Sequence, residues 1–238
     1  MRILTALLFL AFIPEARAWT QTQVQHIAAG CTVSPCVVSL SATGANHLLV
    51  VGFEDNAFTD VMGAPPSGAC ALPWVHAPNA PAAYAPAGDL NDIYYCLQSN
   101  SGITSFSQPV TTFTGTADVI VWEAISTLPR FALDSGANPG NKVANASCTS
   151  CSGVPLTLSG NSDFIVVMSG GAGAVSGLTG AGFTYDGTTS FGDGFGHSMT
   201  VGSLTAPTTW IASAGLNGAY AVAFQETGGD SDGGVITF

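Results

Sequence analysis

The chain contains two uninterrupted apolar runs of strand length, His47-Leu-Leu-Val-Val-Gly-Phe53 and Phe164-Ile-Val-Val-Met168. A strand that lacks polar alternation has both of its faces covered, so we expect these two runs to be central strands. By contrast, Ser105–Thr114 alternates between polar and apolar residues and contains Pro109. Because proline cannot donate a ladder hydrogen bond, this segment is predicted to be an edge strand or to contain a bulge.

Segments rich in Val, Ile, Phe, Tyr, Trp and Thr recur along most of the chain. These residues fit a pleated, half-buried surface, so the segments are predicted to be strands. The predicted strands are Val24–Ala28, Val37–Ala42, His47–Glu54, Ile93–Gln98, Ser105–Thr114, Val119–Ser126, Leu156–Ser159, Phe164–Ser169, Phe183–Tyr185, His197–Val201, Thr209–Ala214 and Tyr220–Gln225. No segment shows the helical spacing of apolar residues. The pattern therefore predicts an all-β fold, an antiparallel two-sheet sandwich, with a single jelly roll as the preferred architecture.

The segments between these strands suggest how the chain is divided. Two long stretches are predicted to be loops, the proline-rich Asp55–Asp92 and the glycine-rich Gly170–Gly196, and loops of this length are often functional. Two tandem immunoglobulin-like domains would need a linker, for which Gly136–Gly153 is the best place. We prefer one β-sandwich domain over residues 19–226, followed by a flexible acidic tail at residues 227–238.

The N-terminal residues have the features of a secretory signal. Arg2 precedes an apolar run from Ile3 to Ile13, and Ala16-Arg17-Ala18 places small residues at the cleavage positions. The run is too short to cross a bilayer, which needs about 20 apolar residues. We therefore expect a signal peptide at residues 1–18, a secreted protein in an extracellular or periplasmic location, and no transmembrane segment.

The charge balance of the chain narrows the range of possible binding partners. The chain has 15 acidic residues against 4 Lys and Arg, which gives a formal net charge of −11. Polyanions such as DNA or an anionic membrane surface would be repelled by this charge. We therefore exclude nucleic acid as a partner, whereas neutral glycans and cell-surface components remain.

Six cysteines follow the predicted signal, and an even number in a secreted chain indicates disulfides. Local spacing favours the pairs Cys31–Cys36, Cys70–Cys96 and Cys148–Cys151 among the alternatives. The segment Cys148-Thr-Ser-Cys151 also has the spacing of a redox or zinc motif. Redox chemistry would require a helix N-terminus that the pattern does not provide, so we expect a structural disulfide there.

Aromatic and polar residues in and beside the first long loop are candidates for ligand binding. Sugars are bound by aromatic rings that stack on their apolar faces and by nearby polar groups that bond their hydroxyls. The candidate ligand-binding residues are Trp74, Tyr84, Asp89, Asn91 and Asp92. Trp74 could instead cover a disulfide, and Trp122 and Trp210 are expected in the core.

Hard oxygen ligands cluster along the chain in a way that would suit calcium. We name Glu54, Asp55 and Asp60 as the candidate metal ligands, with further acids at Asp186 and Asp193. The alternative is turn chemistry, because Asp and Asn side chains cap turns. The four histidines occur singly and are expected to be surface or turn residues. We expect no organic cofactor, so calcium is the one cofactor under consideration.

The catalytic signals are weak. Gly196-His-Ser-Met-Thr200 resembles a hydrolase nucleophile elbow, but it falls inside a predicted strand, where His197 and Ser198 would face opposite sides. A glycosidase needs two carboxyls in one cleft, and Glu123 is the best single candidate because it lies in an apolar strand. A strand-end glutamate pointing to solvent is the alternative interpretation. We therefore predict no catalytic centre.

The order of several short motifs resembles that of a known group of proteins. The motifs are Ala-Thr-Gly-Ala-Asn-His-Leu-Leu-Val-Val (42–51), Pro73-Trp74, Asp92-Ile-Tyr-Tyr95, Asn100-Ser-Gly102, Val121-Trp-Glu123, Leu133-Asp134, Ser162-Asp-Phe-Ile-Val-Val167 and Ala221-Val-Ala-Phe-Gln225. Over most of residues 19–226 the chain resembles uncharacterised secreted bacterial β-sandwich proteins of concanavalin-like fold. The resemblance implies a fold and secretion, and it carries no catalytic motif.

These observations favour a secreted, non-catalytic β-sandwich binding module, with a glycan or a cell surface as its partner. One alternative is an extracellular structural or assembly subunit, in which the tail ending in Val235-Ile-Thr-Phe238 would add a strand to a neighbouring copy. That role would make self-association part of the function. The other alternative is a glycosidase or a polysaccharide lyase.

Overall fold

The computed structural model describes residues 22–55, 60–84, 89–113, 115–126, 130–134, 136, 140–159, 163–171, 173–180, 182–188, 191–200 and 208–227. The predicted signal peptide, and the predicted tail beyond Thr227, lie outside these residues. The described chain is built of strands and one short 3-10 turn, η1 (Ser67–Ala69), so the all-β prediction is confirmed. Within this part of the chain, no helix is long and apolar enough to cross a membrane.

Sheet I is antiparallel and has six strands. Its strands run in the order β1 (Thr22–Cys31), β10 (Ala117–Ile125), β3 (Leu48–Asp55), β7 (Asp89–Cys96) and β5 (Val75–His76), and β6 (Ala82–Tyr84) also pairs with β7. The apolar run 47–53 forms most of β3, and every residue of this strand is buried. The prediction of a central strand covered on both faces is therefore confirmed.

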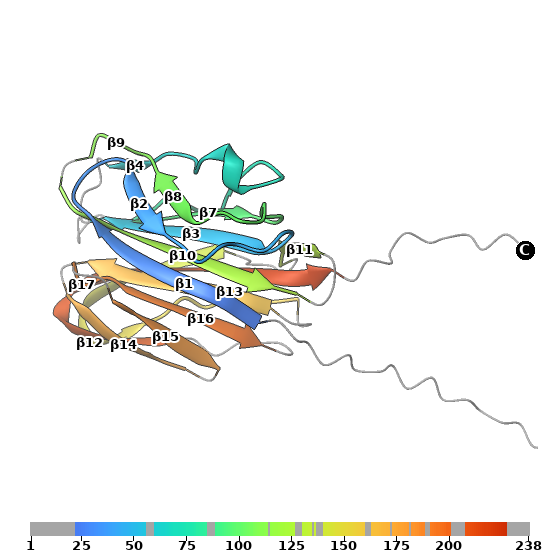
Figure 1. Ribbon diagram of the computed structural model, residues 1–238. Helices are drawn as coiled ribbons and strands as arrows, with labels where there is room; N and C mark the ends of the chain where they lie inside the picture. The colour runs from blue at the N-terminus through green and yellow to red at the C-terminus, as the bar shows by residue number, and fades with distance from the viewer. Residues whose placement is uncertain are drawn as a thin grey trace, which may run out of the picture.

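One face of sheet I carries an outer layer, drawn above the sheet in Figure 1. In this layer β2 (Cys36–Ser39) pairs with β8 (Ser105–Gln108), and β4 (Val61–Met62) pairs with β9 (Val110–Thr111). Pro109 separates β8 from β9, so the predicted strand 105–114 is interrupted at its proline. Apolar residues of this layer, such as Phe106, form one buried cluster with Phe53 of sheet I.

Sheet II is antiparallel, has seven strands and lies on the opposite face of sheet I (Figure 1). Its main path is β11 (Arg130–Leu133), β17 (Thr209–Thr227), β13 (Asp163–Gly171), β16 (Gly194–Thr200) and β15 (Phe183–Thr188), and both β12 (Gly140–Ser152) and β14 (Val175–Thr179) also pair with β17. Because β14 returns beside β15, the sheet curls until it is nearly closed.

The two sheets are held together by a buried apolar cluster. It includes Val50 and Trp122 from sheet I and Phe164 from sheet II. Gly52 marks how closely the sheets approach, since a Cβ atom at this position would lie 2.7 Å from Met168 Sδ. A separate cluster fills the inside of curled sheet II. The fold therefore has one core under the outer layer, one between the sheets and one within the curl.

Sheet II contains three features that the sequence pattern did not predict. Residues 140–152 form β12, where a linker was the alternative expectation, and residues 175–179 form β14 inside a predicted loop. The predicted strands 209–214 and 220–225 are parts of one continuous strand, β17. Both missed strands are rich in Gly, Ser, Thr or Asn, and they become strands because β17 supplies a partner for their backbone.

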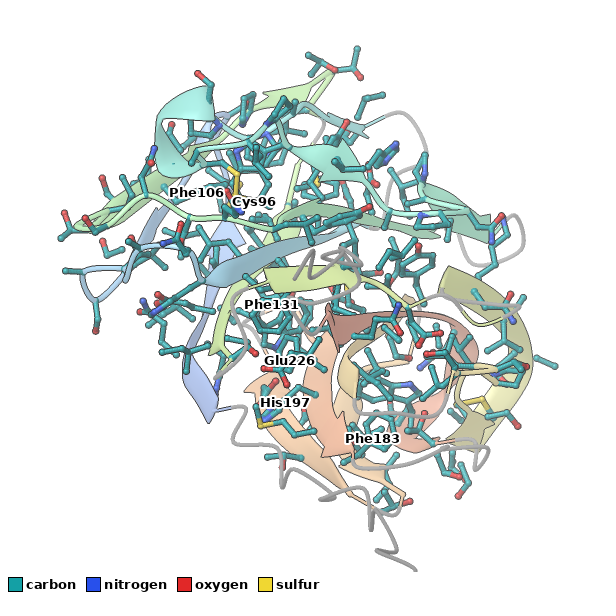
Figure 2. The ribbon with its side chains drawn as sticks, turned by 90° about the vertical axis from the view of Figure 1, so that its right-hand side faces the viewer. Cys96, Phe106, Phe131, Phe183, His197 and Glu226 are labelled. Atoms are coloured by element: carbon teal, nitrogen blue, oxygen red, sulfur yellow. A yellow bond between two sulfur atoms is a disulfide. The ribbon has the colours of Figure 1, made fainter. Side chains whose placement is uncertain are left out.

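The six cysteines form three disulfides, Cys31–Cys36, Cys70–Cys96 and Cys148–Cys151. These are the pairs that local spacing favours. The first joins β1 to β2, the second joins the end of η1 to β7, and the third lies within β12. Figure 2 shows Cys96 of β7 beside Phe106 of the outer layer, and the second disulfide fixes the end of η1 to sheet I.

Candidate functional site

The structure separates the residues that the sequence grouped as a ligand-binding set. Asn91 and Asp92 are neighbours in β7, so their side chains lie on opposite faces of sheet I. Trp74 is half-buried, packs edge-to-face on Phe106 with ring centroids 5.7 Å apart, and contacts the cluster that contains the Cys70–Cys96 disulfide. Tyr84 and Asp89 pair through their backbones in β6 and β7, and their side chains lie outside the described residues.

The outer face of β5 and β7 nevertheless carries a compact group of ring and carboxylate side chains. The imidazole of His76 stacks on the ring of Tyr94, with centroids 4.5 Å apart and planes within 15°. The same imidazole is hydrogen-bonded through Nε2 to Asp92 Oδ1. His76 is exposed and Tyr94 is half-buried, so both rings reach the surface. We call these three side chains the His76 face.

Burial controls the electrostatics of the His76 face. Desolvation raises the pKa of Asp92 above its ordinary value, and the neighbouring His76 opposes part of that rise. The pKa of Tyr94 is also raised, first by burial and then by the nearby Asp92 carboxylate. The Tyr94 hydroxyl therefore stays protonated at neutral pH and is available as a hydrogen-bond donor.

Each of the four histidines lies beside a buried carboxylate. The expectation of surface residues is right for His26 and His76, which are exposed, whereas His47 is half-buried and His197 is buried. His47 Nδ1 is 2.6 Å from Glu123 Oε1. Glu123 also accepts hydrogen bonds from the Gln25 side chain and the Gly44 backbone N–H. This glutamate is fully buried and is held by donors, so its position is that of a structural group rather than an open catalytic acid.

Asp186 brings two further histidines together. It stands at a register shift between β15 and β16, where a bulge turns its side chain inward. Its carboxylate accepts a hydrogen bond from Trp122 Nε1 at 2.7 Å, lies 2.7 Å from His197 Nδ1 and lies 3.6 Å from His26 Nδ1. Trp122 and His26 belong to sheet I. His197, labelled in Figure 2, belongs to sheet II. Asp186 therefore bridges the two sheets.

The hydrolase-like segment 196–200 does not form a nucleophile elbow. It lies within β16, which pairs regularly with β13. His197 points toward the space between the sheets, and Ser198, its neighbour in the strand, faces the opposite side. The expectation that these two residues cannot act together is confirmed.

A second group of carboxyls lies between the sheets, near one end of the strands. Asp193 is hydrogen-bonded to the side chains of Glu54 and Asp118. Burial, followed by the neighbouring Asp193, raises the pKa of Asp118 to about 9. The pKa of Asp193 is likewise raised by burial. We call Glu54, Asp118 and Asp193 the carboxyl cluster.

The carboxyl cluster differs from the predicted metal site. Glu54 belongs to both sets, and the charge of its neighbour Asp55 also raises the pKa of Asp118. Asp60 is buried directly before β4. In the described residues, the carboxyls are paired with one another, and no group of three or more His, Cys, Asp or Glu side chains has its donor atoms arranged around a common point.

Comparison of the chain with protein-family models, with curated proteins and with solved structures finds no match.

Proposed function

We propose that the protein is an extracellular binding module for neutral glycans and that the His76 face is its binding surface. The observation that carries the proposal is the stacked pair His76–Tyr94, which reaches the surface and is tied to the buried Asp92. Aromatic rings stack on the apolar faces of sugars, and adjacent polar atoms bind the hydroxyl groups. In the His76 face, the paired His76 and Tyr94 supply the rings, and Asp92 supplies a polar carboxylate beside them.

The support beneath this face favours a preformed site. Tyr94 and Asp92 lie on β7, which is held between β3 and β5 by backbone hydrogen bonds. Trp74, two residues before His76, donates from Nε1 to Pro66 O at 3.1 Å and packs on Phe106. A fixed surface loses little conformational freedom when it binds, so Trp74 contributes by supporting the His76 face.

The chain's charge and covalent structure support the rest of the proposal. A formal net charge of −11 disfavours polyanionic glycans and leaves neutral ones. Three disulfides are typical of proteins outside the cytosol, which supports the expected signal peptide and secretion. The two facing antiparallel sheets are compatible with the expected concanavalin-like jelly roll, and that architecture remains part of this proposal.

The experiment is retention of the purified protein on a panel of immobilised neutral polysaccharides. We expect retention on at least one of them, and we expect His76→Ala and Tyr94→Ser each to reduce it about tenfold or more, as for central aromatic contacts at interfaces. Tyr185→Ser is the matched control, because Tyr185 is also half-buried but lies on β15 of sheet II.

If His76→Ala and Tyr94→Ser are both retained as strongly as the unaltered protein, the His76 face is not the binding surface and the assignment is overturned. A chain that is retained by none of the polysaccharides would overturn glycan binding itself. Assaying the supernatant for released reducing ends tests the alternative, since release would show a glycosidase or a lyase.

A further inference from the structure

The inner face of sheet I carries a row of three polar side chains at one end of an otherwise apolar surface. Asp118 pairs with Glu54 across β10 and β3, and Glu54 pairs with Asn91 across β3 and β7. Strand alternation places these residues on the same face as Ile120 and Ile93, which belong to the core between the sheets. Cross-strand neighbours of this kind have Cβ atoms about 5 Å apart, so the three side chains form one continuous group.

Sheet II closes over this row. Asp193, immediately before β16, is hydrogen-bonded to Glu54 and Asp118 and accepts a backbone hydrogen bond from Gly171. The Glu54 carboxylate lies against Gly170 of β13, where a Cβ atom would come within 2.0 Å of Oε1. Glycine at this position therefore leaves room for the carboxyl group between the two sheets.

Among the described residues, the ionisable groups within this space are all acidic. The ionisable groups that act on Asp118 are Asp193 and Asp55, which are both acidic. Two carboxyl oxygens come within hydrogen-bond distance only when a proton or a cation lies between them, because two carboxylates repel each other. The space between the sheets at this point thus requires added positive charge.

Asn91 supplies an independent observation. Its side chain is fully buried, and among the residues that the structure describes neither Oδ1 nor Nδ2 has a hydrogen-bond partner. Buried amides are nearly always hydrogen-bonded, and an exception requires an explanation such as a missing ion. Asn91 adjoins Glu54 on the inner face, so its amide oxygen is a neutral ligand directed to the same space as the carboxyl cluster.

We propose that Glu54, Asp118, Asp193 and Asn91 form a binding site for one hard divalent cation of the size of Ca²⁺. The donors are all oxygens, which Ca²⁺ prefers, and three carboxyls together with one amide oxygen can provide six or more contacts at its usual coordination number. Cation binding requires the carboxyls to give up their mutual hydrogen bonds and turn toward a common point. The site includes Glu54 of the predicted metal ligands and replaces Asp55 and Asp60 with residues from three other segments.

This site is independent of the proposed glycan binding. The His76 face lies on the outer side of sheet I, whereas the cation site lies between sheets I and II. The two proposals therefore succeed or fail separately.

The test uses the purified full chain, stripped of metal with a chelator and then dialysed to equilibrium against Ca²⁺ or Mg²⁺ at neutral pH. We expect one Ca²⁺ per chain, weaker binding of Mg²⁺, and an increase in Tm of about 5 °C or more when Ca²⁺ is saturating. If no Ca²⁺ is retained and Tm is unchanged, shared protons alone occupy the cluster and the proposal is overturned.

Variants separate a ligand role from a structural role. In Asn91→Leu we expect the Ca²⁺-induced increase in Tm to fall to less than about a quarter, while the metal-free protein is no less stable, because an unpartnered amide has been replaced by an apolar group. Asp193→Asn is the second variant, and we expect it to weaken Ca²⁺ binding about tenfold or more. If both variants keep the full response to Ca²⁺, the assignment of these ligands is wrong.

Asp134→Asn is the matched control. Asp134 is another buried carboxylate, but it accepts hydrogen bonds from Ser159 and from the Gly136 backbone N–H. We expect this variant to lower Tm and to retain the Ca²⁺-induced increase. Loss of the increase in this variant as well would mean that Ca²⁺ acts on the fold in general, which would also overturn the site.

Discussion

The buried carboxylates of this protein fall into two regions that differ in the side chains lying against them. At Glu123, Asp92 and Asp186, a histidine imidazole lies directly against the carboxylate. In the carboxyl cluster between the sheets, the side-chain hydrogen-bond partners of Asp193 are two further carboxyls. The first region carries its own hydrogen-bonding partners, whereas the second depends on protons or ions from solution.

The difference follows from the composition. With only 4 Lys and Arg in 238 residues, the chain has few permanent cations that could accompany buried acids. Histidine is a compact substitute that packs within a sheet and donates from a ring nitrogen. The regions should therefore respond differently to substitution, pH and divalent ions, and four experiments test this difference.

The largest effect is expected from His47→Ala. It leaves Glu123 fully buried without its imidazole, and removing one partner of a buried pair costs about 3–5 kcal/mol. The free energy of unfolding, measured by urea denaturation, should fall by this amount. A loss below about 1 kcal/mol would show that solvent or the remaining donors, Gln25 and Gly44, satisfy Glu123.

The next effect is a dependence on pH in the presence of a chelator. The pKa of Asp118 is about 9 in the folded protein, against an ordinary value of 3.8, so the folded state keeps a proton that the unfolded state loses. The contribution of Asp118 to the free energy of unfolding is therefore fully present below about pH 4. It is lost progressively as the pH rises from 4 to 9. Between pH 5 and pH 8 we expect a decline of about 4 kcal/mol.

The matched variant for this pH dependence is Asp118→Asn, in which the decline should largely disappear. An unchanged decline would assign the dependence to another group. Saturating Ca²⁺ should also reduce the decline of stability with pH if the cation replaces the shared protons.

A smaller effect is expected from Gly170→Ala. The added Cβ would lie 2.0 Å from Glu54 Oε1. The Glu54 carboxyl must therefore move away from its position between the sheets. We expect a loss of about 2 kcal/mol, typical of overpacking in a core, and weaker Ca²⁺ binding. Gly115→Ala is the control, because a Cβ there would have no heavy atom within 4 Å. An unchanged free energy of unfolding in Gly170→Ala would show that the added methyl group fits beside the Glu54 carboxyl.

The smallest effect on stability is expected from His76→Ala. The His76 side chain is 36% exposed, so solvent can partly replace its interaction with Asp92. We expect a loss of about 1 kcal/mol or less in urea denaturation, although binding to a glycan should suffer strongly. A loss as large as that of His47→Ala would contradict the distinction between an exposed and a buried histidine pair.

The sequence predicts the central strands because their signal is local. The apolar run 47–53 and the run 164–168 form β3 and β13, and Pro109 interrupts an edge segment as expected. β12 was missed because Gly, Asn and Ser dominate its residues, and its strand conformation depends on a partner, β17, that lies far along the chain. The disulfides were predictable because each cysteine pairs with its neighbouring cysteine along the chain.

The functional groups were harder to predict because they depend on register. His47 and Glu123 are 76 residues apart, and their contact follows from the pairing of β3 with β10. Glu54 and Asp118 each adjoin a continuous apolar run, so alternation could not show which face they occupy. Asn91 and Asp92 looked like one polar group until the orientation of β7 separated them. Only the stacking order of the sheets reveals that Glu54, Asp118 and Asp193 meet.

The long strand β17 has a consequence for how the molecule is made. It pairs with β11, β12, β13 and β14, and its residues 209–227 are synthesised after all four of these partners. Sheet I has all of its strands by residue 125, whereas four strands of sheet II must wait for this partner. During synthesis the first half of the chain can therefore form its sheet early, while residues 130–179 remain open to chaperones and proteases until β17 arrives.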